Sequence, residues 1–127
     1  MLEITKASMI HFFNEYQLEW DDEKRLKFMK QAETYRIYDK ETLGYFQIRE
    51  NSDILYLYDI QILPPYRKKG IGRKIVNYVI NVARERHCDK INLAVFKSSP
   101  AINLYQKSGF KIFEETEAVY RMEKLIM

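Results

Sequence analysis

The sequence predicts a single domain of the mixed α/β class over residues 1–127, with a β-sheet flanked by helices. Three observations lead to this prediction. Helical periodicity fills the first quarter of the chain, three β-rich runs follow, and helices then alternate with strands. Hydrophobic residues make up 46% of the 127 positions and charged residues 31%, a balance that is typical of one globular core.

The N-terminal segment is predicted to contain one short strand and two helices. Leu2–Thr5 fits a strand, and Ala7–Leu18 carries apolar side chains at helical spacing. Asp21 and Asp22 are suited to the start of a second helix, because carboxylates accept hydrogen bonds from the free amides there. We expect this helix to end near Ala32.

Three strands are expected next, rich in β-branched and aromatic residues, at Thr34–Tyr38, Leu43–Arg49 and Ile54–Leu63. The polar triplets 40–42 and 51–53 separate them and favour turns, so neighbouring strands should be antiparallel. The third strand should end before Pro64 and Pro65, which have no amide hydrogen to continue a ladder.

The second half of the chain alternates between helices and strands. The expected elements are a helix from about Gly70 to Arg86, a strand at Lys90–Phe96, a helix at Ser99–Ser108, and a hairpin at Phe110–Phe113 and Val119–Leu125. The long helix carries a broad apolar stripe, and Gly109 is placed to end the short one. The strand-helix-strand unit from Ile54 to Val95 should pair its two strands in parallel, through a right-handed crossover.

Composition narrows the class of protein. Cys88 is the only cysteine, and no stretch approaches the ~20 apolar residues that span a bilayer, so we expect a cytoplasmic protein with no membrane contact. A net charge of +3 is too small to indicate nucleic-acid binding by itself. Five of the 21 basic residues, however, lie between Arg67 and Lys74, where they should attract a compact anion.

The basic segment leads from a strand into a helix through a turn with the sequence Arg67-Lys68-Lys69-Gly70-Ile71-Gly72. A helix N-terminus has unpaired amides and a partial positive charge, and glycines let a phosphate approach them. A nucleotide P-loop is excluded because no serine or threonine follows Gly72, and the dinucleotide fingerprint would need a glycine at Ile75. The pattern Arg/Gln-x-x-Gly-x-Gly/Ala is the one that fits.

A second motif lies about thirty residues downstream, with a predicted strand between the two. It consists of Ala101-Ile102-x-Leu104-Tyr105-x-Lys107-x-Gly109-Phe110, and the first motif extends back to Ile60-x-Ile62-Leu63-Pro64-x-Tyr66-Arg67. Together they resemble the signature segments of the GNAT superfamily of acetyl-CoA-dependent N-acetyltransferases. The resemblance is close from about Ile54 to Phe113. It implies a GNAT-like domain with a splayed mixed sheet of about six to seven strands, flanked by about four helices.

The resemblance also implies how acetyl-CoA would bind. The strands that end at Ile62 and Val95 would part, and the pantetheine arm would lie along the first. The amide of Ile62 would donate to the thioester carbonyl. Many relatives have asparagine where this chain has Ser98, whose shorter hydroxyl would contact the pantetheine arm. The pyrophosphate would meet the turn, where the expected binding residues are Arg67, Lys68, Lys69, Gly70, Ile71, Gly72 and Arg73.

Acetyl transfer to an amine requires a deprotonated nucleophile, a polarised carbonyl and a protonated leaving sulfur. The resemblance implies that Tyr105 contacts the sulfur, both as a binding residue and as the general acid. The alternative is that Tyr105 has no catalytic role and only packs on the apolar face of its helix. Asp59 is the candidate general base, with a chain of water molecules as the alternative. The acceptor cannot be named from the sequence, although the acidic segment Trp20–Glu23 would suit a cationic amine.

Two other functions compete with this one. The domain could hold acetyl-CoA and regulate a partner without transfer, or the basic cluster could bind nucleic acid. The cluster surrounds two glycines at a helix start, which suits a compact phosphate better than a nucleic-acid groove. His11 and His87 have no neighbours at metal-ligand spacing, so no metal is expected. We therefore expect a monomer or homodimer whose partners are acetyl-CoA and an amine.

Overall fold

The computed structural model describes residues 32–126, which form a six-stranded mixed sheet in the order β1-β2-β3-β4-β6-β5. The strands are β1 (Glu33–Asp39), β2 (Glu41–Asn51), β3 (Ile54–Ile62), β4 (Lys90–Phe96), β5 (Lys111–Glu115) and β6 (Val119–Leu125). The helices in this part of the chain are α3 (Ile71–Glu85), α4 (Ala101–Lys107) and the 3-10 turn η1 (Pro64–Tyr66). The predicted strand at Leu2–Thr5 and the two N-terminal helices lie outside the described residues.

Tight turns make the strands of the meander longer than the sequence predicted. Between β1 and β2 only Lys40 leaves the strands, with a left-handed φ of 66°. Between β2 and β3 the turn consists of Ser52 and Asp53, with φ of 52° and 65°. Two successive left-handed residues are typical of the two-residue hairpin turn that matches strand twist. The predicted antiparallel pairing of the three strands is confirmed.

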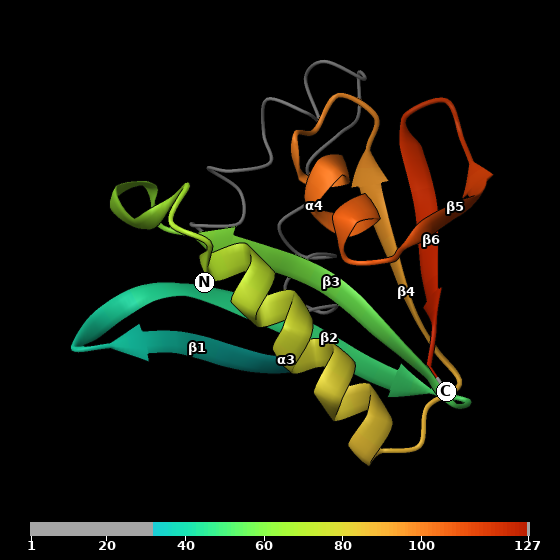
Figure 1. Ribbon diagram of the computed structural model, residues 1–127, viewed down its shortest axis with the longest axis horizontal. Helices are drawn as coiled ribbons and strands as arrows, with labels where there is room; N and C mark the ends of the chain where they lie inside the picture. The colour runs from blue at the N-terminus through green and yellow to red at the C-terminus, as the bar shows by residue number, and fades with distance from the viewer. Residues whose placement is uncertain (1–31, 127) are drawn as a thin grey trace.

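Strands β3 and β4 pair in parallel at one end only. Their register joins Ile54 to Lys90, Leu55 to Ile91 and Tyr56 to Asn92. Figure 1 shows the two arrows diverging beyond this point, so that the sheet opens. Among the described strands, none pairs with the edge of β3 that faces β4 past Tyr56. The predicted parallel pairing and parting of these two strands are confirmed.

A β-bulge interrupts β3 just after the last residue that pairs with β4. Gln47 of β2 pairs with Asp59, whereas the next residue, Ile48, pairs with Leu57. Tyr58 is therefore an extra residue on β3. A bulge increases the local twist of a strand, and burial still alternates along the whole of β3, from Leu55 and Leu57 to Asp59 and Gln61. The buried positions before the bulge are therefore apolar, and those after it, Asp59 and Gln61, are polar.

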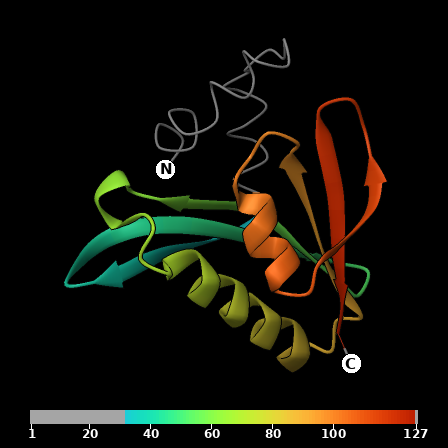
Figure 2. The same cartoon turned by 45° about the horizontal axis from the view of Figure 1, so that its top comes forward.

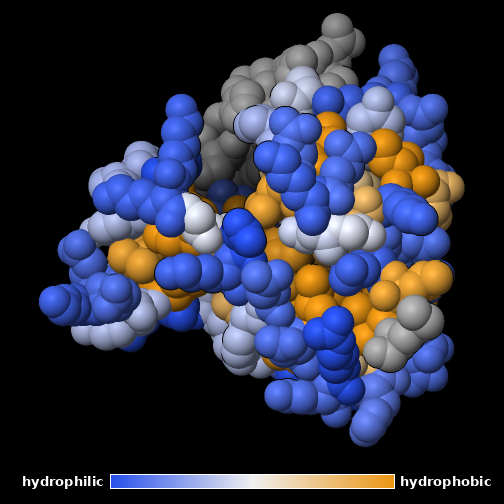
Figure 3. Space-filling view, viewed as in Figure 1, coloured by the Kyte–Doolittle hydropathy of each residue, from blue (hydrophilic) through white to orange (hydrophobic). Residues whose placement is uncertain are grey.

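Both described helices cover the same face of the sheet (Figures 1 and 2). Helix α3 lies across β1–β3 and buries Ile75, Val76 and Val79 against them, while α4 lies beside the end of β4. Figure 3 shows that hydrophilic side chains dominate the outer surface of this face, with apolar atoms visible between them. The apolar stripe predicted on the long helix is therefore the inner side of α3.

Candidate active site

The segment between β3 and α3 forms the turn that the sequence predicted as an anion site. Lys68, which is exposed, and Gly70 have left-handed backbones, with φ of 62° and 80°, and they turn the chain just before the helix. Gly70 is the N-cap of α3 and has no side chain that could occupy the amides of the first turn. The amides of Ile71, Gly72 and Arg73 therefore point out of the helix start, where an anion can accept hydrogen bonds from them.

The backbone of Ile62 faces the opening between β3 and β4. The amide of Leu63 donates to the carbonyl of Leu43 at 2.8 Å, so this N–H points toward β2. Because successive peptide groups of a strand alternate in direction, the amide and carbonyl of Ile62 point the opposite way. The neighbour of β3 on that side is β4. The amide that the sequence predicted as a donor to the thioester is thus directed into the opening.

The structure divides the basic cluster among three places. Arg67 turns back toward β3, where its Nε donates to the carbonyl of Ile62 at 2.8 Å. Arg73 lines a groove between α3 and α4. Lys69 and Lys74 line a second groove, on the side of α3 that faces the β1–β2 hairpin. Cations that are contiguous in the sequence therefore do not converge on one point.

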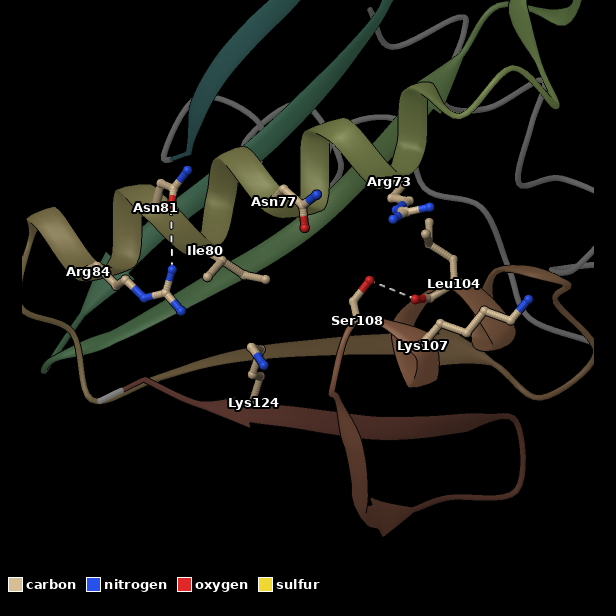
Figure 4. Close-up of a pocket in the computed structure, with 9 residues that line it drawn as sticks. All are labelled: Arg73, Asn77, Ile80, Asn81, Arg84, Leu104, Lys107, Ser108 and Lys124. Atoms are coloured by element: carbon tan, nitrogen blue, oxygen red, sulfur yellow. Dashed lines mark hydrogen bonds between the residues drawn. The ribbon is translucent and has the colours of Figure 1, made fainter.

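The groove between α3 and α4 is strongly basic (Figure 4). It encloses about 670 Å³, and four cations but no carboxylates are among its lining residues. The cations are Arg73, Arg84, Lys107 and Lys124. Of the three that sequence reasoning missed, Lys107 stands inside the second motif, a position that could have identified it. Arg84 and Lys124 are ordinary exposed cations in sequence, and only the fold brings them into the groove.

Gly72 allows the two helices to approach each other. A Cβ at this position would lie 3.2 Å from Cδ2 of Leu104 on α4. The glycine therefore allows the first turn of α3 to lie next to the helix that carries Tyr105. Gly70 differs, because a Cβ there would meet open space. Its left-handed backbone is what favours glycine.

We predict that Gly72→Glu weakens CoA binding by at least about tenfold, because a carboxylate at the helix start repels an anion and the side chain presses on Leu104. Gln106→Glu is the matched control, since it makes the same charge change at an exposed position of α4. Titration calorimetry with CoA measures both. Unchanged affinity in a folded Gly72→Glu protein would remove this turn from the binding site.

Tyr105 and Asp59, from elements far apart in the sequence, lie close enough to interact electrostatically. Tyr105 is 9% exposed and Asp59 6%, although both carry polar groups. Burial, and to a lesser extent the negative charge of Asp59, raises the pKa of Tyr105 to about 12. The phenol therefore keeps its proton at neutral pH. The ring also belongs to the hydrophobic core and packs on Phe110, so its packing role is confirmed.

Ser98 is exposed in the turn that follows β4, and its predicted contact with the pantetheine arm stays a prediction. The neighbouring Ser99 has a structural role that the sequence did not reveal. Its Oγ accepts the amide of Ala101 at 3.2 Å and so helps to begin α4. The bonding of Ser99 places the start of the helix immediately after the turn that contains Ser98.

The remaining residues singled out in the sequence have structural explanations or lie elsewhere. Cys88 is buried, and burial raises the pKa of its thiol, which disfavours a nucleophilic role. His87 has a left-handed φ of 57° directly after the C-cap of α3, the position at which helices commonly end. His11 and Trp20–Glu23 lie outside the described residues.

Within residues 32–126, no three His, Cys, Asp or Glu side chains form a metal-binding group. None of the helices in this range is long and apolar enough to cross a membrane.

Comparison with known proteins assigns the class. The model of the acetyltransferase (GNAT) family matches residues 1–110, which is most of the chain. The chain therefore belongs to the GNAT acetyltransferase family, and the resemblance seen in the two motifs is confirmed.

Two relatives illustrate the range of acetyltransferases to which the chain is similar. It is 38% identical to N-alpha-acetyltransferase 50 of Danio rerio over 74 residues, which are 57% of this chain and 44% of that protein. It is 41% identical to thialysine N-epsilon-acetyltransferase of Mus musculus over 64 residues, 50% of this chain and 38% of that protein. The chain thus spans less than half the length of these relatives.

Solved structures show the same fold. A Bacillus subtilis acetyltransferase in complex with CoA superimposes with a TM-score of 0.74 at 20% identity, covering 83% of this chain and 84% of that one. A GNAT family acetyltransferase from Elizabethkingia anophelis with acetyl-CoA bound gives a TM-score of 0.73 at 18% identity, covering 83% of each chain. At these identities the likeness establishes the architecture of the sheet and helices.

Proposed function

We propose that this chain transfers the acetyl group of acetyl-CoA to an amine. The amide of Ile62, directed into the opening between β3 and β4, carries the proposal. Two further features support it: the start of α3, whose N-cap Gly70 has no side chain, and the buried residues Tyr105 and Asp59, which interact electrostatically. These groups come from three separate elements. The Ile62 amide, Tyr105 and Asp59 each match one requirement of the reaction, and the start of α3 suits the pyrophosphate of the substrate.

The described residues fit acetyl-CoA as a substrate. The edge of β3 beyond Tyr56 can hold an extended arm with amide groups in the way that a sheet edge accepts an added strand. The first turn of α3 offers amides to a pyrophosphate. Arg73 and Lys107, which lie at the same end of the basic groove in Figure 4, supply positive charge for the nucleotide portion.

In the proposed reaction, the nitrogen of a neutral amine bonds to the thioester carbon and the carbon–sulfur bond breaks. One proton leaves the nitrogen and one arrives at the sulfur, so the products are an amide and a thiol. The amide of Ile62 stabilises the charge that develops on the carbonyl oxygen. Asp59 receives the proton from the nitrogen, directly or through a water molecule, and Tyr105 donates its hydroxyl proton to the sulfur.

The proximity of Asp59 to Tyr105 solves a difficulty with this proton transfer. The pKa of Tyr105, about 12, is well above the value of about 8.5 for a free thiol, so a lone phenol would be a reluctant donor. The proton that Asp59 gains from the amine can replace the one that Tyr105 gives up. A net transfer from nitrogen to sulfur then leaves no phenolate behind.

The direct test is thiol release from acetyl-CoA in the presence of a panel of amines, namely polyamines, amino acids, and peptides with free N-termini or lysines. We expect release that depends on the amine for at least one class, with the acetylated product identified by mass spectrometry. Tight CoA binding without thiol release for any class would overturn the proposal. That outcome would favour the domain that binds acetyl-CoA and regulates a partner.

The same site predicts how salt affects binding. The affinity for CoA should fall between about 0.05 and 0.5 M salt, because its phosphates meet cations and helix amides that are screened by ions. The affinity for a pantetheine fragment, which has no phosphate, should change little over the same range. Calorimetry with both ligands measures the difference. Equal salt dependence for the two ligands would contradict a role for the basic turn and groove.

A further inference from the structure

Arg67 stands out because its side chain is bound to the backbone of the strand that precedes it. Its Nε donates to the carbonyl of Ile62 at 2.8 Å, across the η1 turn. The peptide group that contains this carbonyl also contains the amide of Leu63, which donates to the carbonyl of Leu43 at 2.8 Å. This peptide group is therefore held at both ends, by β2 on one side and by Arg67 on the other.

We propose that Arg67 is a positioning residue, which fixes the peptide group after Ile62 and thereby aims the preceding amide of Ile62 into the opening. The inference rests on the proposed function, in which this amide stabilises the thioester oxygen. The end of β3 can twist on the side of the opening, because β2 pairs with it on one edge and β4 no longer pairs with the other. A hydrogen bond from Arg67 to the Ile62 carbonyl restricts that twist before a substrate arrives, and preorganised donors are the ones that contribute most to catalysis.

The assignment makes a prediction that a purely electrostatic role does not make. If Arg67 acted only through its charge on the phosphates, its loss would weaken substrate binding and leave the chemical step unchanged. If it orients the Ile62 amide, its loss should lower kcat as well, because the amide meets the developing charge in the transition state. The test therefore needs two variants that both remove the charge, one that keeps a hydrogen-bond donor and one that does not.

Two neutral substitutions meet this need. In Arg67→Gln the side-chain nitrogen is as many bonds from Cα as Nε is in arginine, so it can still donate to the Ile62 carbonyl. In Arg67→Met a methyl group takes that place, and both the donor and the charge are lost. We expect KM for acetyl-CoA to rise similarly in both variants. We expect kcat to stay within about threefold of wild type in Arg67→Gln and to fall by about 10- to 100-fold in Arg67→Met.

Equal kcat values for the two variants would overturn the proposal, whatever their KM. A readout that needs no turnover keeps the test independent of the proposed function. The carbonyl carbon of Ile62, followed by NMR in the free protein, should shift in Arg67→Met and stay near its wild-type position in Arg67→Gln. A carbonyl shift that is the same in both variants would show that Arg67 does not position this peptide group. If the Ile62 carbonyl shifts as expected in both variants but wild type releases no thiol, the proposed function alone would be refuted.

Discussion

Replacing Tyr105 with phenylalanine should lower turnover by about 10- to 1,000-fold and leave the affinity for CoA almost unchanged. The substitution keeps the ring, which packs in the core against Phe110, and removes only the hydroxyl group. The substitution leaves the start of α3 and the edge of β3 unchanged, where we propose that the pyrophosphate and the pantetheine arm bind, so binding should not suffer. Steady-state kinetics on a good acceptor, with calorimetry for CoA, measure the two quantities separately.

Tyr38→Phe is the matched control for this variant, because it removes a phenol hydroxyl from an exposed position on β1. It should turn over acetyl-CoA at the wild-type rate. Full turnover in Tyr105→Phe would show that Tyr105 only packs and that the sulfur takes its proton from solvent.

The raised pKa of Tyr105 also predicts the shape of the pH profile. In the proposed mechanism the protonated phenol is the active form, so its contribution should be lost only as pH rises through about 12. Between about pH 6 and 10, turnover by wild type and by Tyr105→Phe should therefore change with pH in parallel, at different absolute rates. A falling limb near pH 10 that is present in wild type and absent from the variant would mean that this phenol titrates normally.

Gly44→Ala should destabilise the protein by about 3 kcal/mol or more. Gly44 lies on β2 opposite Ile62, and an added Cβ would collide with the carbonyl oxygen of Gln61 on β3. The obstacle is the backbone of a paired strand, so it cannot rotate away as a side chain can. The substitution would also push the end of β3, which carries the Ile62 amide, out of place.

Urea denaturation measures this effect, and Gly72→Ala provides the comparison. The Cβ of an alanine at position 72 would meet the flexible end of Leu104, which can move by a few tenths of an ångström. Its cost should be less than about 1 kcal/mol of stability. A Gly44→Ala protein that unfolds at the wild-type urea concentration would show that β2 and β3 can separate at this point without penalty.

Much of the described fold could be predicted because its signals are local. The six strands, the long helix and the parallel unit around it follow from side-chain periodicity and from Pro64, Pro65 and Gly109 as ends of elements. The predicted turns of the meander were too long, because one or two residues with left-handed backbones, such as Lys40, are enough to reverse the chain. Lysine and serine have no special preference for a left-handed backbone, so their presence in the sequence does not indicate such a turn.

The sequence by itself determined the family and the position of the glycine turn before α3, because both depend on residues that are contiguous in the chain. Only the tertiary structure decided which side chains share a site. Arg73 and Lys74 are neighbours in sequence but project about 100° apart around a helix, so they line different grooves. Asp59 of β3 lies near enough to Tyr105 of α4 to help raise its pKa, and Arg67 donates to a backbone carbonyl. Such contacts depend on the packing of elements far apart in the chain, which local patterns do not encode.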